Sequence, residues 1–66
     1  MTIFSIRDVF DIAVKIEERG EKFYRETAKV ISKAEVKELF EKLADEEVAH
    51  KKIFRQMAQK IGAIKL

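Results

Sequence analysis

The chain has 66 residues, of which 39% are charged and 47% are hydrophobic, with a net charge of +2 and no Cys, Trp or Pro. This length allows one small domain at most, and the lack of Cys excludes disulfides and thiolate metal sites. No apolar run is long enough for a signal peptide or a membrane span, so we expect a cytoplasmic protein with no membrane partner. A lone helical chain of this size buries little apolar surface, so we also expect self-association.

Charges of both signs are interspersed along the chain, and the densest basic group lies in its last third. No groove-reading motif or stacking aromatic residue accompanies this group. We therefore interpret it as a solvated helix face and expect no nucleic-acid partner. The group consists of Lys51, Lys52, Arg55 and Lys60.

The first predicted element is a helix over about residues 5–30. Ser5 and Asp8 match a capping box, with Phe4 and Val9 placed for a hydrophobic staple across it. Apolar residues then recur in columns at seven-residue steps, which indicates a helix of more than seven turns. The columns are Ile6, Ala13, Gly20, Thr27; Val9, Ile16, Phe23, Val30; and Phe10, Glu17, Tyr24, Ile31.

The second predicted helix covers about residues 33–61. Ser32 and Glu35 match another capping box, and Gly62 is placed to end the helix. A connection of only a few residues makes the two helices antiparallel neighbours. The sequence therefore predicts one all-α domain over residues 1–66, an antiparallel two-helix hairpin. The columns of this helix are Phe40, Glu47, Phe54, Ile61 and Val36, Leu43, His50, Met57.

Three polar residues, Glu17, Glu47 and His50, interrupt these apolar columns. Carboxylate and imidazole groups in a core seam are costly unless something compensates them. Counted from the turn, Glu17 lies about 14 to 15 residues back and Glu47 about 15 to 16 forward. At roughly 1.5 Å per residue, the heights of the two carboxylates therefore differ by only a couple of Å. His50 lies one helical step from Glu47, so we expect the three side chains to meet.

This meeting point lies near the middle of both helices, so a second copy packed about a two-fold axis would complete a four-helix bundle. Two copies would bring one Glu from each of two helices and Glu-x-x-His from each of the other two, which is the donor set of di-iron and di-manganese carboxylate bundles. Donors of this kind favour iron first, manganese second and zinc third. We therefore predict a homodimer or higher homo-oligomer with a di-iron centre shared by two chains.

Two segments, Glu17–Tyr24 and Phe40–His50, resemble the first helix pair of the rubrerythrin and ferritin-like superfamily. The resemblance covers roughly residues 13–54 and implies a ferritin-like four-helix bundle. Family members usually carry two such pairs in one chain. With its single pair, this chain also resembles the half-length encapsulated ferritins, whose metal centre forms between two subunits, and that likeness implies an encapsulating shell protein as a further partner.

The same resemblance implies roles for individual residues. Glu17 would be a metal ligand, Glu47 the bridging carboxylate and His50 the nitrogen ligand. Tyr24 would supply a hydroxyl that supports the ligands, while a core aromatic with its hydroxyl at the rim is the alternative for this residue. The function implied is oxidation of Fe(II) by oxygen or peroxide, a ferroxidase-type oxidoreductase activity.

Two other interpretations fit the same residues. One is a rubrerythrin-like peroxide reductase that uses an external electron donor, because a chain without Cys has no rubredoxin-type iron centre of its own. The other is a non-enzymatic helical assembly module in which a polar core layer fixes the register of the bundle. The last interpretation predicts that iron changes neither the melting temperature nor the oligomeric state.

Further expectations concern residues outside the ligand set. Gly20, in an inward column, indicates either close approach of a bulky neighbour or a tolerated weak point in the helix. Glu18, Glu21 and Glu46 should be solvated, with Glu46 as an alternative feeding position for iron. The predicted helix pairs are Glu18 with Lys22 and Glu21 with Arg25. The predicted core aromatics are Phe10, Phe23, Phe40 and Phe54.

Overall fold

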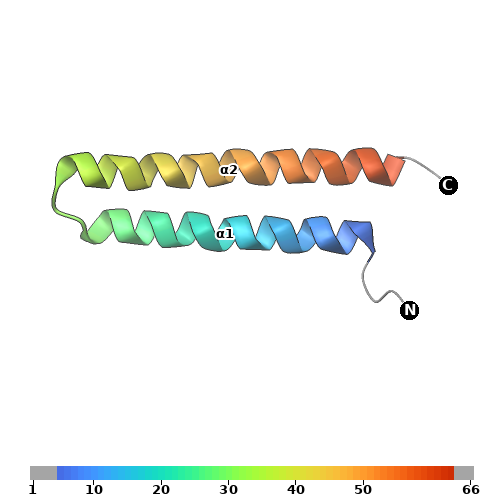
Figure 1. Cartoon of the computed structure of the whole chain (residues 1–66), viewed down its shortest axis with the longest axis horizontal. Helices are drawn as coiled ribbons and strands as arrows, with labels where there is room; N and C mark the ends of the chain where they lie inside the picture. The colour runs from blue at the N-terminus through green and yellow to red at the C-terminus, as the bar shows by residue number, and fades with distance from the viewer. Residues whose placement is uncertain (1–4, 64–66) are drawn as a thin grey trace.

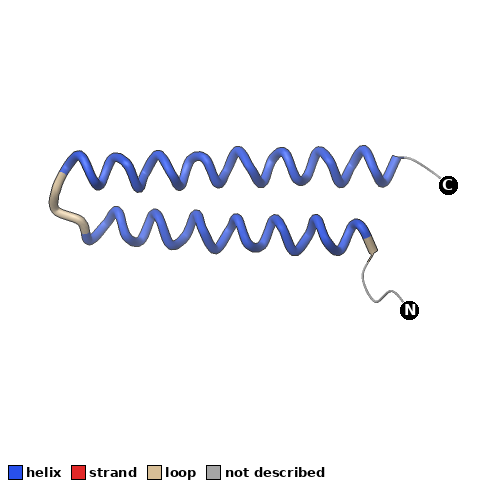
Figure 2. The backbone as a smooth tube through the Cα atoms, in the orientation of Figure 1, coloured by secondary structure: helices blue, strands red, loops and turns tan. Residues whose placement is uncertain are grey.

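A computed structural model describes residues 5–63, with side chains described for residues 5–61. Helix α1 spans Ile6–Val30 and helix α2 spans Ala34–Ala63. Figure 1 shows the two helices antiparallel and side by side, and Figure 2 shows how short the connecting loop is. The predicted all-α helical hairpin is therefore confirmed. Within residues 5–63, neither helix is long and apolar enough to cross a membrane.

The start of α1 has the capping box that the sequence predicts. Ser5 Oγ accepts a hydrogen bond from the Asp8 backbone N–H at 3.1 Å, and the Ser5 N–H donates to Asp8 Oδ2 at 3.0 Å. Two N–H groups that would otherwise lack a partner at the helix end are satisfied in this way. The predicted staple cannot be followed further, because Phe4 lies outside the described residues.

The second predicted capping box is wrong. Ile31 is extended, with φ −82° and ψ 127°, and the chain uses residues 31–33 to cross between the helices. Helix α2 therefore begins at Ala34, and the carbonyl of Lys33, not that of Ser32, accepts the first helical hydrogen bond, from the Lys37 N–H at 3.0 Å. A cap at Ser32 would need a helix that begins one residue earlier.

The end of α2 also differs from the prediction, because the helix includes Gly62 and runs to Ala63. A glycine that ends a helix normally adopts a positive φ, and no residue in the described range does so. Gly62 is thus an ordinary helical residue here, at the modest cost that glycine carries in a helix. The tail considered with it, residues 64–66, lies outside the described range.

The contact between α1 and α2 is a narrow seam. Ala44 and Ala28 are the fully buried residues of the described range, and both are small, which lets the backbones approach. Two aromatic pairs fill the seam on either side of its middle, with ring centroids 6.4 Å apart for Phe10 and Phe54 and 6.0 Å apart for Tyr24 and Phe40. The seam accounts for three of the four predicted core phenylalanines.

The fourth, Phe23, is not in the core of the hairpin, since it is 60% exposed. Two helices share only one line of contact, so the rest of a wide apolar stripe stays uncovered. At 3.6 residues per turn, all but one of the exposed large apolar residues lie on the same side of the hairpin, which we call the open face. They are Ile6, Val9, Ile12, Ile16, Phe23, Val30, Leu39, Ile53, Met57 and Ile61, with Val48 on the other side.

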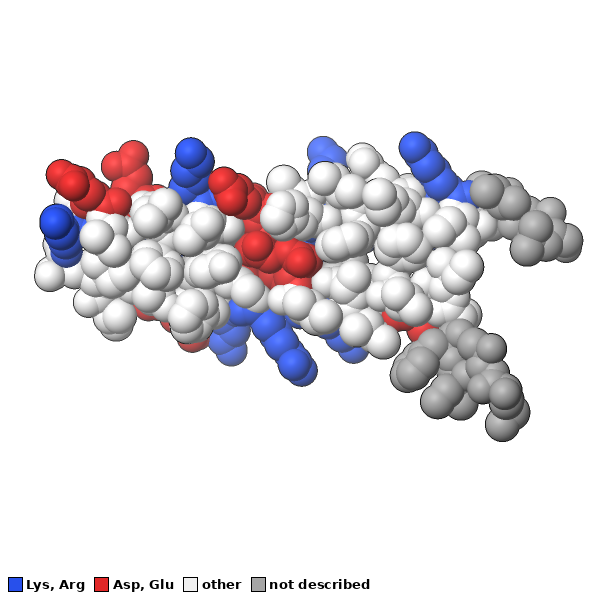
Figure 3. Space-filling view, viewed as in Figure 1, with Lys and Arg blue, Asp and Glu red and all other residues white. Residues whose placement is uncertain are grey.

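Figure 3 views the hairpin onto one broad face, where uncharged side chains extend over both helices and acidic side chains gather near the middle. The molecule measures 52 × 22 × 10 Å, so it is a single layer of helices. A layered protein normally covers an apolar face with a second layer. The open face is therefore a surface suited to packing against a second layer.

Candidate metal centre

The middle of the seam holds a cluster of three ionisable side chains, Glu17 from α1 and Glu47 and His50 from α2. His50 Nδ1 lies 3.1 Å from Glu17 Oε2, at hydrogen-bond distance, and 3.6 Å from Glu47 Oε1. One ligand atom from each residue lies within 4.8 Å of the other two. The structure thus brings together the three residues that sequence spacing placed at one height.

The cluster sits at the centre of a repeating pattern. Along α1, Glu17 lies seven residues from Phe10 and seven from Tyr24. Glu47 has the same relation to Phe54 and Phe40 along α2. Because the helices are antiparallel, each aromatic ring meets one from the other helix, and the carboxylates meet between the two aromatic pairs. The rings close the seam on both sides of the cluster along the hairpin axis.

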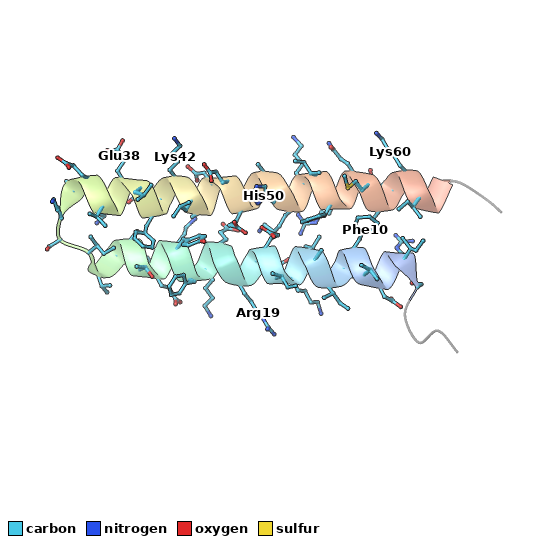
Figure 4. The ribbon with its side chains drawn as sticks, viewed as in Figure 1. Phe10, Arg19, Glu38, Lys42, His50 and Lys60 are labelled. Carbon is cyan, nitrogen blue, oxygen red and sulfur yellow. The ribbon has the colours of Figure 1, made fainter. Side chains whose placement is uncertain are left out.

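The cluster is exposed mainly through His50, which lies on the side of α2 that belongs to the open face. The side chains of Glu17 and Glu47 are 18% and 17% exposed, whereas that of His50 is 50% exposed. Figure 4 shows His50 over the middle of α2, while Arg19 points away from the seam. One side of the imidazole and the edge of the carboxylate pair therefore lie toward the open face.

The two carboxyl groups compete for one proton. A hydrogen bond with Glu17, burial and the charge of Glu17 raise the pKa of Glu47 above its ordinary value of 4.5. The hydrogen bond from Glu47 and the contact with His50 lower the pKa of Glu17, against the effect of burial. Of the two carboxyl groups, Glu47 thus holds a proton more readily and Glu17 loses one more readily. Two carboxylates this close favour any cation that could replace the proton.

Gly20 lies one helical turn from Glu17, and the side chain of Glu47 lies against it. A Cβ atom built on Gly20 would lie 3.1 Å from Glu47 Oε2 and 3.4 Å from Glu47 Cδ. Of the two explanations that the sequence allowed for this glycine, close approach of a bulky neighbour is the one that the structure supports.

Tyr24 packs with its ring between Phe23 and Phe40. Its hydroxyl makes no hydrogen bond to the cluster among those found in the described residues. Support of the ligands by this hydroxyl stays a prediction, and the packing is that of a core aromatic. Glu46 is exposed, as expected.

A second group of charged residues was missed by the sequence reasoning. Lys51 Nζ donates to Glu21 Oε1 at 2.6 Å, with 14% and 23% of the two side chains exposed. Arg25 contacts Glu21 at 3.4 Å, which confirms the predicted helix pair, and donates to Asp45 at 2.9 Å. Glu21 is thus half-buried and not solvated. Its signal was present, because Glu21 and Lys51 lie four residues beyond Glu17 and Glu47.

The other predicted helix pair is not found. Glu18 Oε1 lies 3.5 Å from Arg55 Nη2 on the opposite helix, and Lys22 does not contact it among the ion pairs of the described residues. A residue in one helix of a hairpin can pair with a residue of the other helix as well as with one of its own helix. Here the side chain of Arg55 reaches Glu18 across the seam.

The chemistry of the donor set fits a hard, oxygen-preferring cation. Carboxylate oxygens with one imidazole nitrogen suit iron and manganese, and no thiolate is present to select a softer metal. Within residues 5–61, one hairpin brings three ligand side chains together, while a resident metal normally takes four to six donors. A metal held by this cluster would therefore need further donors, and His50 is the member of the cluster that is most exposed.

The family model described as Rubrerythrin matches residues 8–65 of the chain, which includes the entire cluster. Comparisons with curated proteins and with solved structures find no match.

Proposed function

Since the chain belongs to the rubrerythrin family, we propose that two copies hold a di-iron centre between them and oxidise Fe(II) with oxygen or peroxide. Domains of this family usually bind iron, and the candidate ligand group of this chain fits a di-iron carboxylate fold. Manganese is the second metal that the donor set suits. The ligands in the proposal are Glu17, Glu47 and His50 from each chain.

One observation carries the proposal: the cluster lies at the centre of the open face, with His50 half exposed toward it. An exposed apolar face of this size is typical of a surface that a partner covers, and ionisable side chains at its middle would be costly to cover unless a cation compensated them. A second hairpin placed on this face about a two-fold axis would cover the apolar residues and add an identical ligand set. The two sets together contain four carboxylates and two imidazoles, which is the donor set of ferritin-like di-iron bundles.

The residues of the chain then have distinct tasks. Glu17 and Glu47 supply negative charge, and because the pKa of Glu47 is raised, a cation that binds its carboxylate competes with a proton. His50 directs Nδ1 toward both carboxylates, so this is the nitrogen placed to join the same cation. Iron bound at such a site supplies the electrons that reduce oxygen or peroxide.

The aromatic pairs form apolar packing on both sides of the cluster along the seam. Phe10 packs with Phe54 and Tyr24 packs with Phe40, so we expect these rings to limit the access of water along the seam. Covering the open face would leave the ligands in a dry environment, in which charge interactions are stronger.

The test is titration of metal-free protein with Fe(II) without air, followed by oxygen, with absorbance and native mass recorded together. We expect saturation at two irons per dimer, and an oxo-ferric absorbance that grows after oxygen is admitted. A helical assembly module predicts no binding and no change of native mass, and that result would reject the proposal. Replacing oxygen by peroxide in the same experiment identifies the faster oxidant.

A further inference from the structure

Gly20 occupies the middle of a 25-residue helix, where glycine is the least favourable residue apart from proline. No turn or kink needs it, since no residue of the described range has a positive φ. What distinguishes its position is the neighbour across the seam. Three consecutive atoms of Glu47 lie near the place that a Cβ would take, Oε2 at 3.1 Å, Cδ at 3.4 Å and Cγ at 3.6 Å.

We propose that Gly20 is a positioning residue, whose missing side chain forms the recess that holds the Glu47 carboxylate beside Glu17 and His50. Gly20 lies on the side of α1 that turns from the seam toward the open face, as His50 does on α2. The recess therefore lets the Glu47 side chain lie across α1 and toward the open face. The consequence for metal binding rests on the proposed function, whereas the packing of Glu47 against Gly20 does not.

The size of the effect follows from the distances. A contact of 3.1 Å between Cβ and a carboxylate oxygen is closer than ordinary van der Waals packing, so Glu47 would have to move by a few tenths of an ångström if residue 20 were alanine. Moving the end of the Glu47 side chain this far should cost part of the stability that alanine adds through its helix propensity, without preventing the helix from forming. Metal–ligand distances, however, are fixed to about 0.2 Å, so the same shift is large for a ligand.

The packing part is tested in metal-free protein by a double-mutant cycle with G20A, E47A and the double variant. On helix propensity alone, G20A should raise the melting temperature by roughly 4–8 °C in a domain of this size. We expect this rise in the E47A background, where the obstructing side chain is gone, and a smaller rise in the wild-type background. Equal rises in both backgrounds would show that Gly20 and Glu47 do not interact, which would overturn the proposal.

The metal part is tested by anaerobic Fe(II) titration of wild type, G20A and a control, T27A. Thr27 lies in the same helix column as Gly20, seven residues nearer the turn, and its change to alanine also improves helix propensity. We expect Fe(II) affinity to fall about tenfold or more in G20A and to stay at the wild-type value in T27A. A G20A protein that is more stable and binds Fe(II) as well as wild type does would mean that Gly20 is only a tolerated weak point.

The two parts separate the possible failures. If wild type binds no Fe(II), the proposed function fails, and with it the metal-positioning role of Gly20. The metal-free cycle then still decides whether Glu47 occupies the recess. If wild type binds Fe(II) and G20A binds it equally well, the proposed function stands and the positioning role is rejected.

Discussion

Two groups of charged side chains lie at nearly the same height of the hairpin, one on the open face and one on the opposite side. The group on the open face contains two carboxylates and one imidazole, so negative charge exceeds positive charge. The opposite group contains two carboxylates, one ammonium and one guanidinium, so its charges cancel. Its members are Glu21, Asp45, Arg25 and Lys51.

The difference separates a charge-balanced group from a candidate binding group. The opposite group satisfies its own charges through contacts of 2.6 to 3.4 Å and needs nothing from outside the chain. The group on the open face is left with two neighbouring carboxyl groups, which shift each other's pKa in opposite directions, and with a half-exposed imidazole. Carboxylates thus occur in both groups, and the excess of negative charge is what distinguishes the candidate metal centre.

The largest effect is expected from the removal of one proposed ligand. E47A should weaken Fe(II) binding by more than about 100-fold and abolish iron oxidation, because loss of residues that only support a ligand already costs about 10- to 100-fold. The hairpin should stay helical, since the seam on both sides of residue 47 is unchanged. Fe(II) titration and circular dichroism measure the two results, with E38A at an exposed position as the control. Unchanged oxidation in E47A would reject the ligand assignment.

The next effect is expected from a variant that changes the proposed dimer surface and leaves the proposed ligands in place. F23K places a charge on the open face at a residue that is 60% exposed in the hairpin, so a monomer should tolerate it. A proposed dimer would have to bury that charge, and we expect native mass to shift to the monomer and Fe(II) affinity to fall with it. E26K, which places a lysine at an exposed position of α1 away from the open face, should behave as wild type. A dimeric F23K protein would place the partner surface elsewhere.

A smaller effect is expected from the opposite group. K51M removes the shortest ion-pair contact of Glu21, which is only 23% exposed, and leaves a half-buried carboxylate with Arg25 alone. Breaking such a pair on one side is costlier than removing both partners, so the melting temperature should fall by several degrees and recover in part in E21Q/K51M. K52M, at an exposed neighbouring position, is the control. Thermal melts of metal-free protein provide the measurement, and no fall in K51M would mean that this group contributes nothing to stability.

The smallest effect is an opposite pH dependence of the two groups in metal-free protein. Contacts with Lys51 and Arg25 lower the pKa of Glu21, so its contribution to stability is full above the ordinary pKa of 4.5 and is lost as the pH falls through the lower folded value. The pKa of Glu47 is raised, so its contribution is full below 4.5 and is lost as the pH rises through the higher folded value.

Denaturant unfolding of metal-free wild type, E47A and K51M from pH 3 to 7 measures both trends. Above pH 4.5, wild type loses the stability that the protonated form of Glu47 contributes, whereas E47A has no such contribution to lose. The free energy of unfolding of E47A relative to wild type should therefore increase with pH. K51M should have a lower free energy of unfolding than wild type, and this difference should shrink as the pH falls below 4.5. Parallel pH curves for all three proteins would show that neither group is perturbed by its neighbours.

The sequence predicted the ligand cluster because Glu17, Glu47 and His50 stand in apolar columns, where a polar residue is conspicuous. It predicted the α1 cap for a similar reason, since the capping box is a local pattern that needs no tertiary contact. The start and end of α2 were wrong by one or two residues. The start of α2 depends on the path of the loop between the helices. The end of α2 differs from the prediction because a glycine can stay helical at small cost.

The charged group opposite the open face was missed because its residues lie on the flank of the seam, where the sequence pattern resembles a solvated face. Contacts such as Lys51 with Glu21 and Arg55 with Glu18 depend on which flanks of two helices come together. Helical periodicity within one helix does not determine that pairing. The misplacement of Phe23 has a related cause, because an apolar column does not distinguish the seam of the hairpin from the surface that a partner would cover.

The open position of the ligand cluster has a consequence for regulation by protein abundance. If each chain carries half of a metal centre, the number of complete centres varies with the square of the chain concentration while most copies are unpaired. A twofold change in synthesis would then change iron oxidation fourfold. Dilution would stop the reaction without any inhibitor, and bound iron would favour the paired form, so that the supply of the substrate metal would itself increase the number of working centres.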